Sequence, residues 1–186
     1  MKTIEKIYQY YSQKYLVSTD SRTIEEGCVF VALKGERFDG NDFAYKVAEE
    51  KIASCVIADR KGLPHHERLF IVDDSLTTLQ ELARLHREKC NIPIIGITGT
   101  NGKTTTKELT AAVLSKKYNL IYTQGNFNNH LGLPLTVLRI KPDTEMAVVE
   151  MGANHPNEIA HLCTIADPDF GIITNIGKAH LEGFGS

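Results

Sequence analysis

The sequence lacks any long hydrophobic run, and its longest unbroken apolar stretch is the six residues from Cys28 to Leu33. A membrane-spanning helix needs about 20 consecutive apolar residues, so we expect no membrane insertion. The first residues, Met1 to Lys6, also lack the apolar core of a secretory signal. These two absences favour a protein that stays in the cytoplasm.

Cysteines are few and far apart. The four stand at positions 28, 55, 90 and 163, and no two of them form a CxxC pair. This spacing fits neither a disulfide framework nor a zinc site. We expect four buried free thiols in a reducing compartment.

Neither sign of charge is in excess. The 21 Lys and Arg residues nearly balance 23 Asp and Glu residues, which gives a net charge of -2. That balance disfavours a polyanion-binding surface, so no nucleic-acid partner is expected. With 186 residues, 42% of them hydrophobic, the composition is that of a globular protein with one large domain or two small ones.

The first half of the chain alternates strand-like and helix-like segments. Strands are predicted at Cys28–Leu33 and Ser54–Ala58, with a helix over Asp42–Lys51 between them. Asp74 is placed to cap a further helix that runs to about residue 89. Asn91-Ile92-Pro93 then interrupts the pattern, which predicts a domain boundary at about residue 90.

The second half alternates strands and helices regularly, which is typical of a parallel sheet with helices on both faces. The predicted strands are Ile94–Thr98, Leu120–Thr123, Met146–Glu150 and Phe170–Thr174. The predicted helices are Lys103–Lys116, a stretch near Leu133–Leu138, and one capped by Asn154, with Pro156 in its first turn, that runs to about Ala166. No helix follows the last strand, so we expect residues 91–186 to be the first part of an incomplete domain.

The strongest motif is Gly99-Thr100-Asn101-Gly102-Lys103-Thr104-Thr105, between a predicted strand and a predicted helix. Glycines let the backbone curl so that several N–H groups face one phosphate, and the helix N-terminus adds partial positive charge. Lys103 can reach the β- and γ-phosphates of a nucleotide, and the Thr104 hydroxyl can bind Mg²⁺. We predict that all seven residues bind ATP, although the standard loop has a glycine at the position of Ile97.

Glu150 ends a predicted buried strand, in the segment Val148-Val149-Glu150-Met151-Gly152. Ligands bind at the carboxyl edge of parallel sheets. Alone, a glutamate at this place is more often solvated or a cap. Beside a phosphate-binding loop it is placed to hold Mg²⁺, and we predict that it does.

Two more loops follow strands in the second half. The loop from Thr123 to Pro134 crowds together Asn126, Asn128 and Asn129, which suits either turns or the recognition of a polar substrate. The segment from Thr174 to Glu182 brings His180 and Glu182 toward the same edge. From spacing alone a structural histidine is the simpler interpretation, because Mg²⁺ prefers oxygen ligands.

The first half carries one further candidate. Asp20-Ser21-Arg22, with the loop from Lys34 to Gly40 downstream, offers hydroxyl, guanidinium and glycine groups that could hold a phosphorylated ligand. On chemistry alone, a solvated loop is the better interpretation.

Taken together, these motifs resemble those of the Mur ligases. That family uses the compact loop Gly-Thr-x-Gly-Lys-Thr/Ser, which accounts for Ile97. The segments Gly125–Asn129, Glu150–Asn154 and Asn175–Glu182 are most similar to members that join D-alanyl-D-alanine (D-Ala-D-Ala) to UDP-N-acetylmuramoyl-tripeptide (UDP-MurNAc-tripeptide). The resemblance covers essentially the whole chain.

The resemblance implies an ATP-dependent ligase of bacterial peptidoglycan precursor synthesis, which works through an acyl phosphate and uses ATP and Mg²⁺. The implied fold class is α/β: a small UDP-sugar domain over residues 1–90, then the N-terminal part of a P-loop-type parallel-sheet ATPase domain over residues 91–186. Ser21 and Arg22 would contact the UDP sugar. The implied catalytic residues are Lys103, Glu150 and His180, and the implied metal ligands are Thr104, Glu150 and His180. Because family members are much longer, we expect this chain alone to be an inactive fragment. We also expect a monomer.

Other interpretations stay open. The ligase that adds the third amino acid shares Asp20-Ser21-Arg22, but typically has Asp-His-Leu where this chain has Ala179-His180-Leu181. The same N-terminal module argues against a folylpolyglutamate synthase. A generic P-loop NTPase would need glycine at position 97. A fragment that keeps only affinity for the nucleotide sugar is a further, non-catalytic alternative.

Overall fold

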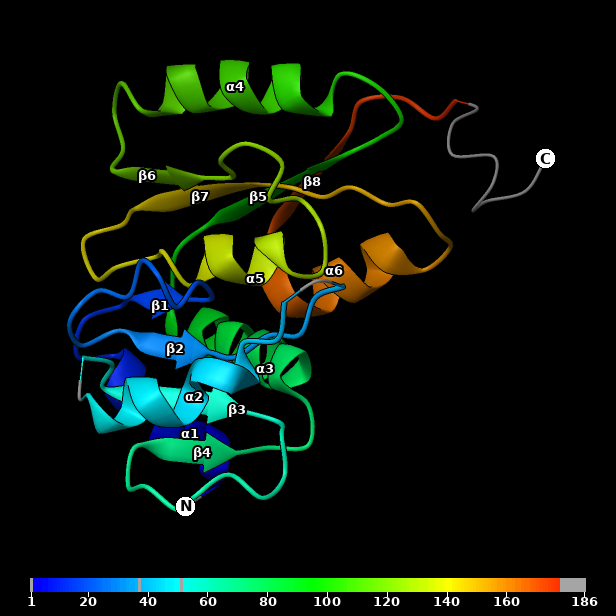
Figure 1. The fold of residues 1–186 in the computed structure, drawn as a ribbon. Helices are drawn as coiled ribbons and strands as arrows, with labels where there is room; N and C mark the ends of the chain where they lie inside the picture. The colour runs from blue at the N-terminus through cyan, green and yellow to red at the C-terminus, as the bar shows by residue number, and fades with distance from the viewer. Residues whose placement is uncertain (1, 37, 51, 178–186) are drawn as a thin grey trace. The chain divides into compact units, whose positions relative to one another are not determined.

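The structure, a computed structural model, describes residues 2–36, 38–50 and 52–177 (Figure 1). The chain divides into two compact units, Met1–Leu82 and Ala83–Ser186. The division falls inside α3 (Ser75–Lys89), the helix that the sequence predicted. As expected from Asp74, its Oδ1 accepts a hydrogen bond from the Thr77 N–H at 2.6 Å.

The first unit contains a four-stranded sheet in the order β1-β2-β3-β4, with every pair parallel. Its strands are β1 (Val17–Ser18), β2 (Val29–Val31), β3 (Cys55–Ala58) and β4 (Leu69–Ile71). Its complete helices are α1 (Thr3–Tyr11) and α2 (Asn41–Glu49). The two predicted strands are confirmed with shorter bounds, and the predicted helix is confirmed but begins one residue earlier, at Asn41, and ends at Glu49. The elements α1, β1 and β4 were not predicted.

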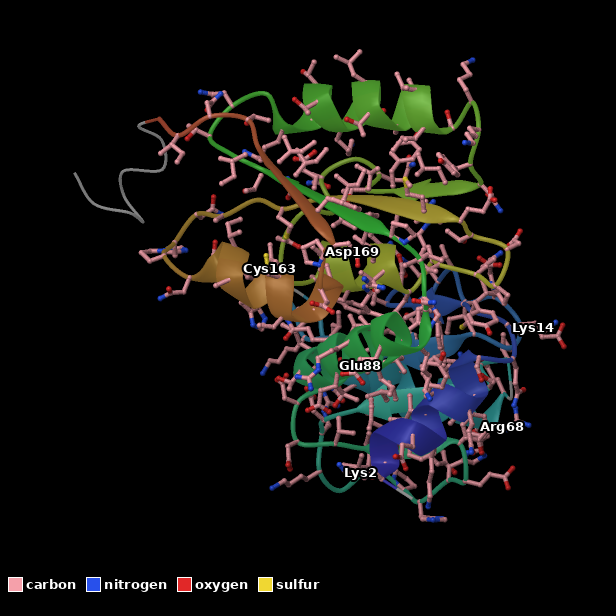
Figure 2. All side chains as sticks on the ribbon, turned by 180° about the vertical axis from the view of Figure 1, so that it is seen from behind. Lys2, Lys14, Arg68, Glu88, Cys163 and Asp169 are labelled. Atoms are coloured by element: carbon pink, nitrogen blue, oxygen red, sulfur yellow. The ribbon has the colours of Figure 1, made fainter. Side chains whose placement is uncertain are left out.

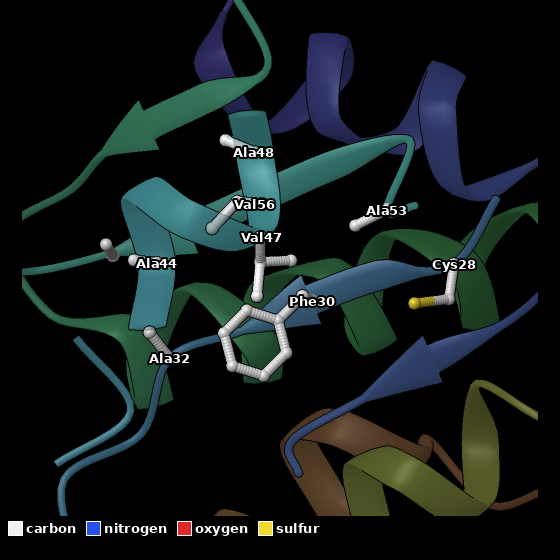
Figure 3. Close-up of a cluster of buried hydrophobic side chains, with 9 residues drawn as sticks. Cys28, Phe30, Ala32, Ala44, Val47, Ala48, Ala53 and Val56 are labelled. Carbon is white, nitrogen blue, oxygen red and sulfur yellow. The ribbon is translucent and has the colours of Figure 1, made fainter. Parts of the chain in front are cut away.

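The core of this unit forms around β2 and β3. Side chains alternate along a strand, so Cys28, Phe30 and Ala32 share one face and join a buried cluster. In Figure 3 the Phe30 ring lies below Val47 of α2. Val29 and Val31 are also fully buried, on the opposite face. A strand that is buried on both faces has a continuous run of apolar residues in the sequence, and for this reason β2 could be predicted.

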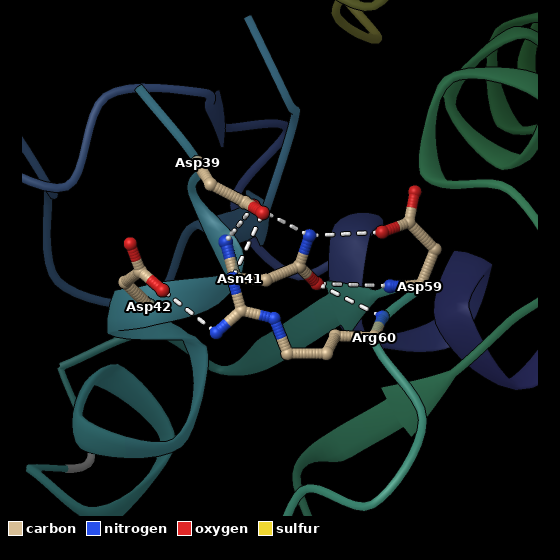
Figure 4. A network of polar contacts seen from close by, with 5 residues as sticks. All are labelled: Asp39, Asn41, Asp42, Asp59 and Arg60. Carbon is tan, nitrogen blue, oxygen red and sulfur yellow. Dashed lines mark hydrogen bonds and ion pairs between the residues drawn. The ribbon is translucent and has the colours of Figure 1, made fainter. Parts of the chain in front are cut away.

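A polar network joins the loop after β2 to the loop after β3 (Figure 4). Asn41, only 2% exposed, donates to Asp39 Oδ1 and Asp59 Oδ1 at 2.8 Å each. Its Oδ1 accepts the N–H groups of Asp59 and Arg60, both at 3.1 Å. The Arg60 guanidinium adds ion pairs to Asp39 at 2.8 Å and to Asp42 at 2.6 Å. One buried amide therefore fixes how two loops leave the sheet.

The second unit contains a parallel sheet in the order β6-β7-β5-β8. The strands are β5 (Ile94–Thr98), β6 (Leu120–Tyr122), β7 (Met146–Glu150) and β8 (Phe170–Ile173). In Figure 1, α4 lies on one face of this sheet, and α5 and α6 lie on the other. These helices span Lys103–Leu114, Gly132–Val137 and Glu158–Ala166. The α/β fold with a parallel sheet is confirmed.

The predicted start of α6 is wrong. The helix begins at Glu158, after Asn157 in a left-handed conformation with φ 69°, so Asn154 and Pro156 precede it. We expected the Asn154 side chain to accept a hydrogen bond from a backbone N–H of the first helical turn. Instead, the Glu158 carboxylate in that turn accepts a hydrogen bond from the Asn154 N–H at 2.6 Å.

Asp169, labelled in Figure 2, anchors the start of β8 in this unit. Its Oδ2 accepts the Ile94 N–H at 2.8 Å and a hydrogen bond from the Arg87 guanidinium at 2.9 Å. Arg87 is 8% exposed and also donates to the carbonyl of Ala166 at 3.0 Å. β8 itself is exposed along its length, with Phe170 at 62% and Ile173 at 63%.

All four cysteines are free, as expected. Cys28 and Cys55 are buried, and burial raises the pKa of both thiols. Cys90 and Cys163 are only half-buried, so the expectation that all four thiols are buried is wrong for these two. Within the described ranges, no helix combines the length and the apolar character that crossing a membrane requires.

Candidate functional site

The carboxyl ends of three strands meet at one edge of the second sheet. β5 pairs in register with β7 and β8, so Ile97 lies beside Glu150 and Thr98 lies beside Ile173. The loops that leave this edge are those in which the sequence placed its phosphate-binding and metal-binding candidates. Ligands of open parallel sheets bind at this kind of edge.

The loop from Gly99 to Gly102 joins β5 to α4. Gly99 has φ 133° and Gly102 has φ 78°, conformations that residues with a side chain rarely adopt. A Cβ on Gly99 would also collide with the Thr174 hydroxyl. Because α4 begins at Lys103, the N–H groups of its first turn have no partner inside the helix. A bent glycine loop that ends in free N–H groups at a helix N-terminus is an anion-binding arrangement.

The Lys103 side chain folds back along this loop. Its Nζ donates to the carbonyl of Gly99 at 2.7 Å and to that of Thr100 at 3.1 Å. The ammonium is therefore held beside the free N–H groups and adds a full positive charge to their partial ones.

Glu150 is the buried acid of the site, with 1% of its surface exposed. Its N–H donates to the Thr123 hydroxyl at 2.9 Å, which fixes the end of β7. Its Oε1 accepts hydrogen bonds from the Thr104 hydroxyl at 3.3 Å and from the Asn128 amide at 2.8 Å. Its Oε2 is buried and has no hydrogen-bond partner among the described residues. The structure thus brings the predicted site residues Thr104, Asn128 and Glu150 together, and Glu150 Oε2 can still accept a ligand.

Lys107 completes this cluster, and sequence reasoning missed it. The residue is fully buried, one helical turn beyond Thr104. Its Nζ lies 3.9 Å from Glu150 Oε2 and 2.9 Å from Glu108 Oε1. A buried ammonium needs such partners, because desolvating an unpaired charge is very costly. The available signal was its position, three residues after Thr104 on the same helix face.

The other two amides of the Asn-rich loop have different surroundings. Asn129 Oδ1 accepts the N–H groups of Leu131 and Gly132 at 3.1 and 2.8 Å, which orders the start of α5. Asn126 is exposed. Of the three predicted residues, Asn128 is therefore the one that contacts the buried acid.

Ser21 and Arg22 lie in the first unit, just after β1 and at the carboxyl end of its parallel sheet. Arg22 donates to Asp20 at 2.9 and 2.6 Å. These hydrogen bonds lower the pKa of the Asp20 carboxyl to about 2. The guanidinium is exposed and keeps its charge balanced by a neighbouring carboxylate.

His180 lies outside the described residues, as does Glu182. Within the described ranges, no three His, Cys, Asp or Glu side chains gather into a group that could hold a metal ion. Of the predicted metal ligands, the structure therefore places Thr104 and Glu150 together.

Two family models match the chain. One, described as Mur ligase middle domain, matches residues 97–186, and the other, described as Mur ligase family, catalytic domain, matches residues 14–87. The chain is 46% identical over 172 residues to the UDP-N-acetylmuramoyl-tripeptide–D-alanyl-D-alanine ligase of Bacillus subtilis. It is 44% identical over 173 residues to the ligase of the same name from Escherichia coli. Each match covers 91% of this chain but 37% of the relative, so the chain spans little more than a third of their length.

Solved structures agree with these matches. MurF from Acinetobacter baumannii superposes with a TM-score of 0.83 at 36% identity, over 97% of this chain and 42% of that one. MurF from Thermotoga maritima, solved in complex with ADP, gives 0.81 at 40% identity, over 97% and 40%. A UDP-N-acetylmuramoyl-L-alanyl-D-glutamate–2,6-diaminopimelate ligase gives 0.54 at 21% identity, over 90% of this chain and 37% of that one, a likeness of fold alone.

Proposed function

This chain belongs to the Mur ligase family, and we propose that it is the N-terminal part of a ligase that joins D-Ala-D-Ala to UDP-MurNAc-tripeptide. The names of the relatives that share up to 46% identity with it support this substrate pair. The structural observation that supports its ATP-dependent part is the Thr104–Glu150–Asn128 contact at the end of the phosphate loop. The ligase for the third amino acid is the weaker candidate, since its structure is only 21% identical.

We assign residues 1–90 to binding of the UDP sugar and residues 91–186 to the first part of the ATP-binding domain. In the first, Ser21 and Arg22 would contact the phosphates of the nucleotide sugar. Their place after β1 supports this assignment, because loops at the carboxyl ends of parallel strands are where ligands bind. The tight Asp20–Arg22 pair holds the guanidinium ready for a second anion.

In the ATP-binding domain, the loop of residues 99–105 would enclose the phosphates of ATP, with hydrogen bonds donated by the N–H groups from Gly102 to Thr105. The first-turn N–H groups of α4 and the Lys103 ammonium supply donors and positive charge. The MurF structure that contains ADP supports a nucleotide as the ligand.

The side chains at this edge fit a magnesium ion. Mg²⁺ takes oxygen ligands. Within the part of the chain that the structure describes, the buried Glu150 Oε2 has no hydrogen-bond partner and lies 3.9 Å from the Lys107 ammonium. Thr104 and Glu150 would hold the ion, and the family resemblance adds His180 at a second ion. When bound, Mg²⁺ would neutralise charge on the phosphate oxygens.

The reaction needs no covalent bond to this chain. The terminal carboxylate of the tripeptide attacks the γ-phosphorus of ATP, and ADP leaves. The D-alanyl amine then attacks the acyl carbon, loses a proton, and phosphate leaves. Lys103 would stabilise the charge that develops on the transferred phosphoryl group, while Asn128 and Thr104 hold Glu150 in place. Because the chain covers only part of its relatives, we propose that it does not complete this reaction alone.

We further place the protein in the bacterial cytoplasm, as a monomer with no nucleic-acid partner. The balanced charge supports the absence of a nucleic-acid partner, and the four free thiols support a reducing compartment.

Calorimetric titration tests the substrate assignment. UDP-MurNAc-tripeptide should bind the wild-type chain saturably, and a Ser21→Ala, Arg22→Ala double variant should lose that binding. Arg84→Ala is the matched control, because it also removes one exposed, ion-paired guanidinium. Equal affinity in the double variant and the wild type would contradict the assignment of Ser21 and Arg22. No binding by either, with folding shown by circular dichroism, would contradict a complete UDP-sugar site in residues 1–90.

A further inference from the structure

The segment that follows β8, residues 174–177, makes several hydrogen bonds to the phosphate loop, residues 99–102. Thr174, Asn175 and Gly177 are near the loop only because β8 pairs with β5. The contacts join residues more than 70 positions apart, for example 74 between Asn101 and Asn175. They involve neither α4 nor the side chain of Lys103.

Asn175 holds the backbone of the loop from both sides. Its Oδ1 accepts the Asn101 N–H at 3.1 Å, and its Nδ2 donates to the Asn101 carbonyl at 3.1 Å. Its own carbonyl accepts the Thr100 N–H at 3.0 Å. The side chain is exposed, so these hydrogen bonds are its contribution, and it fills no core position.

Neighbouring residues reinforce this contact. The Thr174 hydroxyl donates to the Asn101 carbonyl at 2.6 Å. The Thr100 hydroxyl accepts the Gly177 N–H at 2.9 Å and lies 3.2 Å from the Gly177 carbonyl. The absence of a Cβ at Gly99 lets Thr174 approach this closely.

These contacts divide the donors of the loop into two groups. The N–H groups of Thr100 and Asn101 are already used within the chain. Those from Gly102 to Thr105 face the open end of α4 and have no partner among the described residues. Only the second group is available to a phosphate.

We propose that Asn175, supported by Thr174, is a positioning residue that holds the phosphate loop in its binding shape before any nucleotide arrives. A loop that is ordered in advance loses less conformational entropy when its ligand binds. The residue acts through the backbone of Asn101 and does not touch the phosphates. This inference rests on the proposed nucleotide-binding function.

The test compares ADP affinity among variants of this chain, measured by calorimetry in the presence of Mg²⁺. Asn175→Ala should weaken ADP binding by about tenfold, since two side-chain hydrogen bonds are lost. Thr174→Val should weaken it in the same direction, and Thr174→Ser, which keeps the hydroxyl, should restore it. Asn119→Ala is the matched control. It removes an exposed asparagine that binds the Asp143 carbonyl at 2.9 Å, next to the opposite, amino-terminal end of β6.

A second readout separates positioning from general destabilisation. In hydrogen exchange, the amides of Thr100 and Asn101 should lose protection in Asn175→Ala, while the amides of β5 and β7 keep theirs. Affinity for UDP-MurNAc-tripeptide should stay unchanged.

The outcomes are distinct. If the wild-type chain binds ADP and Asn175→Ala binds it equally well, the positioning role is overturned and the nucleotide site stands. If Asn175→Ala and Asn119→Ala weaken ADP binding to the same extent, the role is likewise overturned. If the folded wild-type chain binds no ADP, the proposed function of this site fails, and the positioning role fails with it.

Discussion

The Thr104 hydroxyl lies 3.3 Å from Glu150 Oε1, although 46 positions separate the two residues. One side chain comes from the first turn of α4 and the other from the last residue of β7. Their meeting follows from the pairing of β5 with β7, which sets the end of one strand beside the loop that leaves the other. A hydroxyl and a buried carboxylate at the end of a phosphate loop are the oxygen ligands that Mg²⁺ favours.

Glu150→Gln should abolish the contribution of Mg²⁺ to nucleotide binding. The amide keeps the size of the side chain but not its charge. We expect ADP affinity in the variant to be the same with Mg²⁺ as with a chelator, whereas Mg²⁺ should strengthen wild-type binding about tenfold or more. Paired titrations with and without the metal measure this. Glu81→Gln, which removes an exposed carboxylate on α3 and contacts none of these side chains, should behave as the wild type. A Mg²⁺ effect that persists in Glu150→Gln would refute the assignment.

Lys107→Met should destabilise the second unit. The substitution keeps the volume of the side chain but removes the ammonium that lies 3.9 Å from the buried Glu150 Oε2. Breaking a buried pair in this way costs about 3 kcal/mol of the free energy of unfolding, measurable by urea denaturation. The double variant Lys107→Met, Glu150→Gln should recover part of that loss, because the two side chains interact directly. Strict additivity of the two substitutions would show that they do not.

The sequence predicted those helices and strands whose apolar residues form a clear pattern, and it did not predict all of the others. β5 and β7 consist mainly of apolar residues, and both have the predicted bounds. α1 was not predicted, although Ile4, Ile7 and Tyr11 have the spacing of one helix face. β4 was not predicted because three residues that are exposed or half-buried carry little periodic signal.

The site shows the same contrast. Local motifs predicted the phosphate loop, because its glycines, lysine and threonine are adjacent in sequence. Lys107 was not predicted, because a lysine in a helix ordinarily faces solvent, and only the fold shows that this one is buried. The hydrogen bonds between Asn175 and Asn101 depend on the pairing of β5 with β8, and no local sequence pattern predicts that pairing.

Asn41→Ala should destabilise the first unit more than its small change in volume suggests. The amide is buried and makes hydrogen bonds to two carboxylates and two backbone N–H groups. Its removal leaves those groups partly unsatisfied, at a cost of about 2 to 3 kcal/mol in the free energy of unfolding. Chemical denaturation of the variant measures the loss. Asn126→Ala, at an exposed position, should change the free energy by less than about 0.5 kcal/mol. Equal effects of the two substitutions would contradict a structural role for the network.

The Asp20 carboxyl should titrate at a pKa of about 2 in the folded chain, because hydrogen bonds from the Arg22 side chain and N–H stabilise its charged form. Arg22→Ala should return that pKa toward the ordinary value of 3.8, and NMR of the carboxyl carbon against pH measures the change.

A pKa that is lower in the folded than in the unfolded chain stabilises the fold above pH 3.8, and this contribution is lost as the pH falls toward 2. Because both side chains are exposed, the effect on unfolding should be small. An unchanged pKa in Arg22→Ala would show that the guanidinium is not held by Asp20. The Arg22 guanidinium would then have no fixed position, and the first unit would lack the ordered cation on which its proposed affinity for the UDP sugar rests.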